Sequence, residues 1–212
     1  MAVTPLRPRR TQAERRAVTR AALLDAAVAC LVERGYAGTT TPAVCVRAGL
    51  SQGALFKHFP SKPALVGAAA AHLFESLIGQ YLQELTRAAR RADRAEAAVR
   101  ALWTVFQRPE LMTALELYLA ARQDPALAAE LKPVMDGHAR ALREQARELF
   151  PSAADAPRFA PTLDLILETL QGMALSHAIA PDPAHERRVL ALAIDLARQA
   201  VATAPRRRAA GG

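Results

Sequence analysis

The segment Gly35–Lys62, GYAGTTTPAVCVRAGLSQGALFKHFPSK, decides the fold expected for this chain. It predicts two short helices joined by the turn Ala48–Ser51. Gly49 supplies the positive φ angle that a tight interhelical turn needs, and the Ser51 hydroxyl is a good N-cap for the next helix. Two short helices joined in this way form a helix-turn-helix, which places the first residues of its second helix in a major groove of DNA.

The sequence on both sides of this segment also favours helices. Thr11 and Glu14 have the spacing of a capping box, so a first helix is expected to begin there and to stop at Gly35. Thr41 followed by Pro42 is an N-cap and first-turn pair for the second helix. The other helices expected are 51 to 58 or 59, a long one from 60–61, 94–107, 109–122, 124–150 with a kink or break at Pro133, 158–180 and 184–204.

The chain is therefore expected to be all-α, with about nine helices and no strands. Residues 1–65 are expected to form a basic arm and a three-helix helix-turn-helix domain. Residues 66–204 are expected to form a helical ligand-binding and dimerisation bundle, followed by a disordered tail at 205–212. The boundary falls inside the fourth helix, so movement of one part is expected to be felt by the other.

Positive charge is concentrated at one end of the sequence. Residues 1–65 hold ten Lys or Arg and three acidic residues, a net charge of +7, whereas residues 66–212 hold 18 bases against 17 acids. This asymmetry predicts a polyanionic partner for the first quarter of the chain only. The basic run Arg7–Arg20 is a phosphate or minor-groove arm by its position, although such a run is also compatible with a solubilising tail.

Composition excludes several classes of protein. No stretch is long and apolar enough to span a bilayer, and the N-terminus lacks a secretory pattern, so a cytoplasmic protein is expected. The two cysteines, Cys30 and Cys45, are too few for a disulfide scaffold and are expected to be buried small residues rather than a redox switch. The histidines have no metal-ligand spacing, and no cofactor is expected. No nucleophile–base pair or phosphate-binding loop indicates an enzyme.

The third helix is too short to bring many side chains to DNA bases. Gln52 is the best hydrogen-bonding candidate, and Gly53 and Ala54 allow close approach of the backbone and contact with a thymine methyl group. Further candidates, expected near phosphates or at the helix starts, are Thr40, Thr41, Ser51, Lys57, His58 and Lys62.

The spaced pattern over roughly residues 19–65 resembles the N-terminal domain of the TetR family of transcriptional regulators. The matching positions are Gly35–Thr40, Val44, Ala48–Ser51, Gly53, Leu55–Phe59 and Ser61–Lys62. The resemblance implies phosphate contacts from Thr40, Thr41, His58 and Lys62, and base-facing roles for Gln52, Ala54 and Lys57. Phe56 stands where the family usually has a tyrosine whose hydroxyl touches a phosphate, so that contact is expected to be absent.

The resemblance also implies a ligand cavity in the second domain, although ordinary helical core is the alternative for each candidate. The cavity residues expected are Trp103, Phe106, Leu115, Tyr118, Arg122, His138, Leu167 and His177, which suit a small, largely apolar ligand. The last two helices, within about 158–204, carry apolar stripes (Leu163, Ile166, Leu167, Leu170, Ala174; Val189, Leu192, Ala193, Leu196, Ala200) that fit a four-helix homodimer interface or internal packing.

We therefore predict a dimeric, ligand-responsive regulator that binds a pseudo-palindromic operator on double-stranded DNA. Repression by steric exclusion of polymerase is expected, but the sequence does not separate a repressor from an activator. Two other hypotheses remain open. One is a helical ligand-binding or enzymatic protein with an incidental basic end, and the other is an architectural DNA-binding protein without ligand control.

Overall fold

The computed structural model describes residues 11–88 and 93–202, and these residues form nine α-helices and no strand. The expected all-α class and helix number are confirmed. Residues 1–10, which include the first part of the predicted basic run Arg7–Arg20, and the predicted tail 205–212 lie outside the described residues. The helices are α1 (Gln12–Gly38), α2 (Thr41–Ala48), α3 (Gln52–Phe56), α4 (Lys62–Ala88), α5 (Arg94–Phe106), α6 (Pro109–Ala121), α7 (Pro125–Leu149), α8 (Phe159–Ile179) and α9 (Pro183–Ala202).

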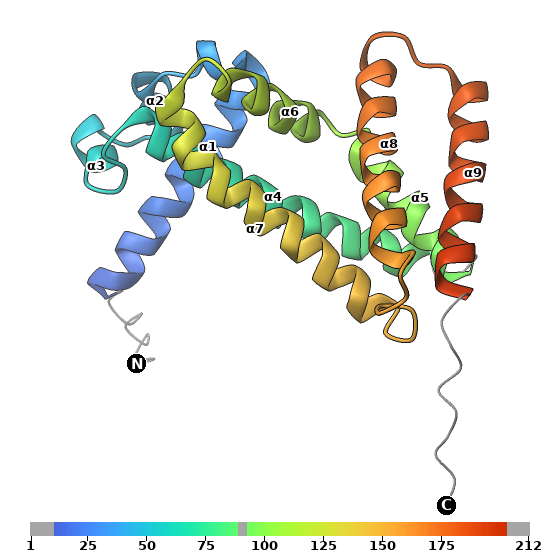
Figure 1. Ribbon diagram of the computed structural model, residues 1–212. Coiled ribbons are helices and arrows are strands. Elements are labelled where there is room, and N and C mark those ends of the chain that lie inside the picture. The colour runs from blue at the N-terminus through green and yellow to red at the C-terminus, as the bar shows by residue number, and fades with distance from the viewer. Residues whose placement is uncertain (1–10, 89–92, 203–212) are drawn as a thin grey trace, which may run out of the picture.

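Helices α1 to α3 form a small head at one side of the molecule, and α5, α8 and α9 stand at the other side (Figure 1). The long helices α4 and α7 pack against each other and connect the two sides (Figure 1). Because α4 is one unbroken helix from Lys62 to Ala88, no flexible linker separates the head from the rest. The predicted domain boundary at residue 65 stays a prediction, since the core is continuous from Leu23 in α1 to Ile194 in α9.

Local signals in the sequence placed most helix starts correctly. The Thr11 hydroxyl accepts a hydrogen bond from the Glu14 amide at 3.2 Å, and the Glu14 carboxylate accepts one from the Thr11 amide at 2.8 Å, which is the expected capping box. Gly35 interrupts α1 with φ 65° and ψ −178°, after which one more turn extends to Gly38. Gly49 ends α2 in the left-handed conformation, as predicted.

Three boundaries differ from the prediction. The N-cap of α2 is Thr40 and not Thr41, because the Thr40 hydroxyl accepts the Ala43 amide hydrogen bond at 3.3 Å. Helix α3 stops at Phe56, short of His58, so it has little more than one turn. Helix α7 continues through Pro133 without a break. The long flanking helical segments and the packing of α7 on α4 outweigh the one backbone hydrogen bond that proline removes.

The described helices contain no segment with both the length and the apolarity required to cross a membrane.

Candidate DNA-binding surface and ligand cavity

The geometry of the α2–α3 turn exposes the first residues of α3. Gly49 carries φ 65° and donates its amide to the end of α2, and the Ser51 hydroxyl accepts from the Ala54 amide at 3.2 Å. Leu55 is fully buried and holds α3 against the core. Gln52 and Gly53 are exposed, whereas Ala54 is half-buried. The predicted base-contacting residues therefore lie on one accessible helix start, and the Ser51 side chain is occupied by capping.

A basic surface flanks this helix. Arg15, Arg16 and Lys57 line an open depression between the start of α1 and the end of α3, together with Gln12, Thr19 and His58. Burial, together with the positive charges of Arg16 and Arg20, lowers the pKa of the His58 imidazole. The described part of the predicted basic arm is thus helical and lies beside α3. This arrangement suits a phosphate backbone, which carries closely spaced negative charges.

His58 gives a testable pH dependence. Because its pKa is lowered in the free protein, the ring is neutral at pH 7, and a nearby phosphate would raise the pKa in the complex. Proton uptake on binding means that affinity for DNA rises as the pH falls, by at most about tenfold per pH unit for one proton. Titrations by fluorescence anisotropy between about pH 8 and pH 5.5 measure this. The His58→Gln variant should show a flatter profile, and an unchanged slope would exclude His58 as the source.

Lys62, one of the predicted phosphate contacts, has intramolecular partners. Its ammonium donates to the Tyr36 carbonyl oxygen at 2.8 Å and lies 4.2 Å from the centre of the Tyr36 ring. Burial lowers the pKa of Lys62. The Tyr36 hydroxyl in turn donates to the Asp124 carboxylate at 2.5 Å, and Asp124 also caps α7 by accepting from the Leu127 amide at 3.0 Å. This Tyr36 latch (Lys62, Tyr36 and Asp124) ties the end of α1 to the starts of α4 and α7.

The latch joins the two parts of the protein through hydrogen bonds that are partly shielded from water. Burial, and then the hydrogen bond to Asp124, raise the pKa of the Tyr36 hydroxyl to about 12, so it remains a donor at physiological pH. The same hydrogen bond lowers the pKa of Asp124. Helix α6 meets α1 beside the latch, where a Cβ at Gly35 would stand 3.0 Å from the Glu116 carboxylate. This role of Tyr36 and Asp124 could not be predicted from the sequence, because no local signal pairs residues 88 positions apart.

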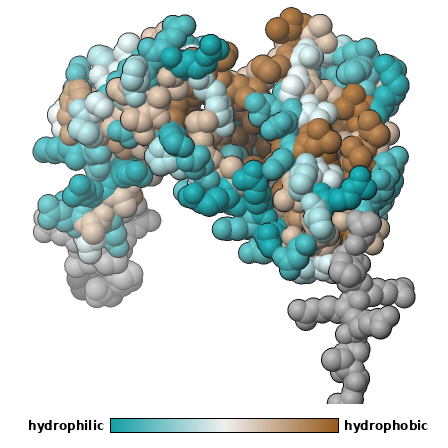
Figure 2. Space-filling view, in the orientation of Figure 1, coloured by the Kyte–Doolittle hydropathy of each residue, from teal (hydrophilic) through white to brown (hydrophobic). Residues whose placement is uncertain are grey.

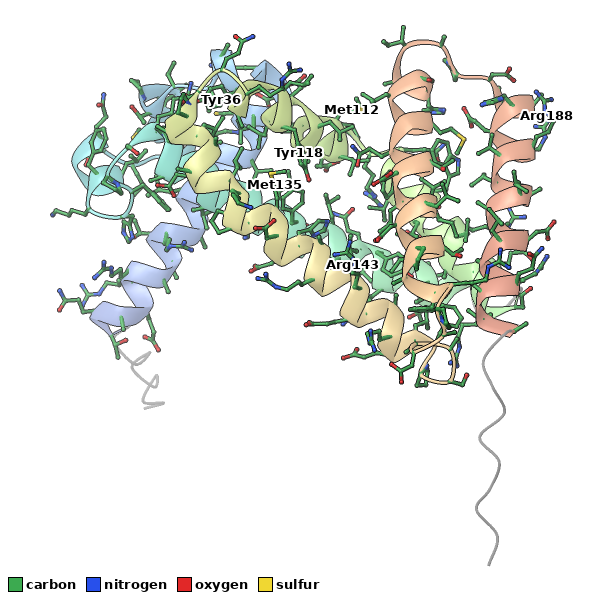
Figure 3. The ribbon with its side chains drawn as sticks, viewed as in Figure 1. Tyr36, Met112, Tyr118, Met135, Arg143 and Arg188 are labelled. Carbon is green, nitrogen blue, oxygen red and sulfur yellow. The ribbon has the colours of Figure 1, made fainter. Side chains whose placement is uncertain are left out.

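A cavity of about 220 Å³ lies among α4, α5, α6, α7 and α8. Its most apolar wall is formed by Phe74, Phe106, Leu111, Leu115, Met135 and Leu167, and its polar groups are Tyr118, His138, Arg143, Asp164, Glu168 and Gln171. Tyr118 and Met135 face the space between α6 and α7, and Arg143 extends from α7 towards α8 (Figure 3). Figure 2 shows hydrophobic surface recessed between α6 and α8, at the same place.

The structure brings together five of the eight predicted cavity residues, namely Phe106, Leu115, Tyr118, His138 and Leu167. Trp103 and His177 instead contact each other edge to face, with their ring centres 5.7 Å apart. The His177 Nδ1 atom also lies 2.7 Å from the Glu186 carboxylate of α9. Arg122 is exposed at the end of α6. Asp164, Glu168 and Gln171 also line the cavity but were not predicted, although with Leu167 they have the spacing of one helix face.

The apolar stripe predicted for dimerisation on α8 packs inside the chain. Ile166, Leu170 and Ala174 are buried in the core, because α8 packs on α5 and α9. A different face of α8 remains exposed, with Leu165, Leu175 and Ile179 at helical spacing, and Leu192 is exposed on α9. Figure 2 shows hydrophobic residues gathered over α8 and α9. The internal-packing alternative is thus correct for the α8 stripe, and the candidate interface moves to this exposed face.

Comparison with known proteins identifies the family. The family model described as "Bacterial regulatory proteins, tetR family" matches residues 23–69, which include the whole helix-turn-helix. Residues 23–69 are therefore a DNA-binding domain of the TetR type. An HTH-type transcriptional regulator of Mycobacterium tuberculosis is 28% identical over 176 residues, covering 82% of this chain and 90% of the relative. The HTH-type transcriptional regulator CymR of Pseudomonas putida is 35% identical over 119 residues, which are 56% of this chain and 59% of CymR.

Solved structures share the TetR fold over most of the chain. The multidrug binding protein EbrR, complexed with imidazole, superposes with a TM-score of 0.66 and 25% identity, covering 90% of this chain and 97% of EbrR. A TetR-family regulator from Streptomyces coelicolor has a TM-score of 0.61 and 25% identity over 82% of this chain and 97% of that one. The chain is therefore a DNA-binding, helix-turn-helix transcriptional regulator whose N-terminal domain is of the TetR type, as predicted from the sequence.

Proposed function

We propose that this regulator is a ligand-responsive repressor that binds a pseudo-palindromic operator as a homodimer in the cytoplasm, acting by binding rather than catalysis. The observation that carries the proposal is α4, whose first residue Lys62 belongs to the Tyr36 latch and whose Phe74 lines the cavity. One rigid element thus contacts both the DNA-binding head and the candidate ligand. A change in the cavity is transmitted to the head through that helix.

The exposed start of α3 and the basic depression beside it support binding to double-stranded DNA. Gln52 is the one long polar side chain at that start, so specificity from each head is modest. Phosphate contacts from Arg15, Arg16 and Lys57 supply most of the affinity. Two heads in successive major grooves add their affinities, which requires a dimer.

The exposed apolar face of α8 and α9 supports that dimer. Leu165, Leu175 and Ile179 share one face of α8 with Gly172, whose missing side chain permits close helix approach. Soluble monomers rarely leave such a contiguous apolar face in water. Pairing this face with its copy would form a four-helix, two-fold interface.

The cavity supports a small-molecule signal. EbrR, a multidrug binding protein of the same fold, is complexed with imidazole, which is consistent with a small ligand for this chain. Helix α6 both lines the cavity through Leu115 and Tyr118 and meets the end of α1 through Glu116. A ligand that displaces α6 or α7 disturbs the Tyr36 latch and changes the separation of the two heads.

The decisive experiment isolates genomic fragments bound by the purified protein and follows their release. Binding to such a fragment should weaken steeply between low and moderate salt, because phosphate contacts release counterions. A ligand that stabilises the protein in a thermal-shift screen should release the fragment. A bound fragment with salt-independent affinity would contradict the DNA-binding surface. Fragment binding with no stabilising or releasing compound would favour an architectural protein without ligand control.

Gln52→Ala and Arg16→Ala separate specificity from affinity. Gln52→Ala should weaken the free energy of operator binding by about 1–3 kcal/mol, because a hydrogen bond to a base edge is lost. It should also relax the sequence preference at one base position. Arg16→Ala should weaken binding to all duplexes about equally and lower the salt slope by about 1, because it removes a phosphate contact. Anisotropy titrations on operators with single base changes measure both. Equal loss across all sequences for Gln52→Ala would remove it as a base-contacting residue.

A further inference from the structure

A second cavity lies next to the first in the bundle. Its volume is about 60 Å³, and its lining is almost entirely apolar, including Tyr81, Leu102, Ala146, Phe150, Leu163 and Ile166. It is formed by α4, α5, α7, α8 and α9, four of which also line the 220 Å³ cavity. We call the larger one the main cavity and the smaller one the apolar cavity.

The two cavities are stacked along the same helices. Residues four positions apart line one cavity and then the other: Leu102 and Phe106 on α5, Ala146 and Leu142 on α7, and Leu163 and Leu167 on α8. Four residues of α-helix span about 6 Å. A single layer of side chains, among them Leu142, Leu163 and Leu167, therefore separates the two spaces. A ligand that occupies both spaces therefore requires these leucine side chains to change rotamer.

The charged groups line only the main cavity, since the apolar cavity has no polar side chains except the hydroxyls of Tyr81 and Thr162, and these charged groups favour a positively charged ligand. Arg143 donates to the Asp164 carboxylate at 3.0 Å, so these two charges compensate each other. Glu168 lines the cavity at its solvent-exposed rim and has no ion-pair partner among residues 11–88 and 93–202, and burial lowers the pKa of His138, which keeps that ring neutral. The main cavity thus has a net negative charge. The aromatic residues Phe74, Phe106 and Tyr118 also line it, with Phe74 stacked on His138, and aromatic rings attract cations.

We propose that the ligand is a single-chain amphiphile with a cationic head, whose head occupies the main cavity near Glu168 and whose alkyl chain enters the apolar cavity. The inference rests on the proposed ligand-responsive function and specifies its ligand class. The head replaces water beside Glu168 and the aromatic rings. The alkyl chain passes the leucine layer and fills space beside the apolar side chains of Leu102, Ala146 and Ile166, which removes its methylenes from water.

Chain length is the first test. Isothermal titration calorimetry compares tetramethylammonium, butyltrimethylammonium and decyltrimethylammonium, each below its micelle concentration. Affinity should rise about fourfold for each methylene that enters the apolar cavity, so the decyl compound should bind at least tenfold more tightly than the butyl compound. Equal affinity for the butyl and decyl compounds, or binding of neither, would overturn the proposal.

Filling the apolar cavity is the second test. Ala146→Leu places a larger side chain into it, and Ala141→Leu is the matched control on the same helix, since Ala141 lines neither cavity. Ala146→Leu should bind the butyl compound with the same affinity as the wild type, which also shows that the variant folds. It should no longer bind the decyl compound more tightly than the butyl compound. Ala141→Leu should keep that advantage. Ala98→Leu, which fills the same cavity from α5, provides a second variant if Ala146→Leu does not fold.

The head charge is the third test. Glu168→Gln should lower the affinity for the decyl cation about tenfold and leave the affinity for decyl glucoside unchanged. Glu144→Gln on α7 is the control, because Glu144 lines neither cavity. Tighter binding of decanoate than of the decyl cation would contradict the proposed cationic head.

Genomic-fragment binding and release are measured separately with the same protein. An amphiphile that fails to bind while the fragment still binds with a steep salt dependence contradicts this inference and leaves the DNA-binding function standing.

Discussion

Leu192→Glu is expected to make the protein monomeric and to lower its affinity for the operator by at least about a hundredfold. Leu192 is 62% exposed on α9, which packs against α8, and α8 carries the exposed Leu165, Leu175 and Ile179. In a two-fold interface each substitution is introduced twice, so two unpaired carboxylates would have to be buried close to each other. A monomer offers one short α3 to the DNA, and it loses the gain from binding two half-sites together.

Sedimentation velocity measures the dimer, and anisotropy on a full operator and on a half-site measures binding. Leu119→Glu is the matched control, because Leu119 is 63% exposed but lies on α6. It should leave the protein dimeric. The half-site affinity of Leu192→Glu should equal that of the wild type, which separates loss of dimerisation from damage to the head. A dimeric Leu192→Glu protein would show that the interface lies elsewhere.

The head could be predicted closely from the sequence because its determinants are local. A capping box, a left-handed glycine and a serine N-cap each act within a few residues, so Thr11, Gly49 and Ser51 mark helix ends without knowledge of the rest of the chain. Even here the end of α3 was misplaced. Whether one further turn forms after Phe56 depends on packing of Phe59 in the core, which is not visible locally.

The bundle was less predictable because its determinants are tertiary. Periodicity on α8 showed that Ile166 and Leu170 are buried, but it did not show which partner buries them. Both a second copy and internal packing were compatible with the pattern, and α5 and α9 of the same chain cover these residues. Similarly, His177 was expected to line the cavity, but its Nδ1 atom lies 2.7 Å from the Glu186 carboxylate and pairs with it.

Gly35→Ala is expected to destabilise the protein by about 3 kcal/mol, and Gly49→Ala by about 1 kcal/mol. Both glycines have φ 65°, but their ψ angles differ. Gly49 has ψ 33°, which is the left-handed helical region that other residues enter at a moderate cost. Gly35 has ψ −178°, a region open essentially to glycine alone. A Cβ there would also stand 3.0 Å from the Glu116 carboxylate, whereas nothing lies within 4 Å at Gly49.

Urea denaturation followed by circular dichroism measures both losses, and the double variant Gly35→Ala with Glu116→Ala separates the two causes. Removing the Glu116 carboxylate relieves the contact but not the backbone strain, so the double variant should recover only a small part of the loss. Full recovery would assign the loss of stability to the contact with Glu116. Equal losses for Gly35→Ala and Gly49→Ala would show that the difference in ψ does not determine the loss.

Because Gly35 turns the chain just before Tyr36, the same strain should also displace the Tyr36 hydroxyl from Asp124. Gly35→Ala should therefore weaken operator binding and its response to ligand together, whereas Gly49→Ala, at the α2–α3 turn, should weaken operator binding alone.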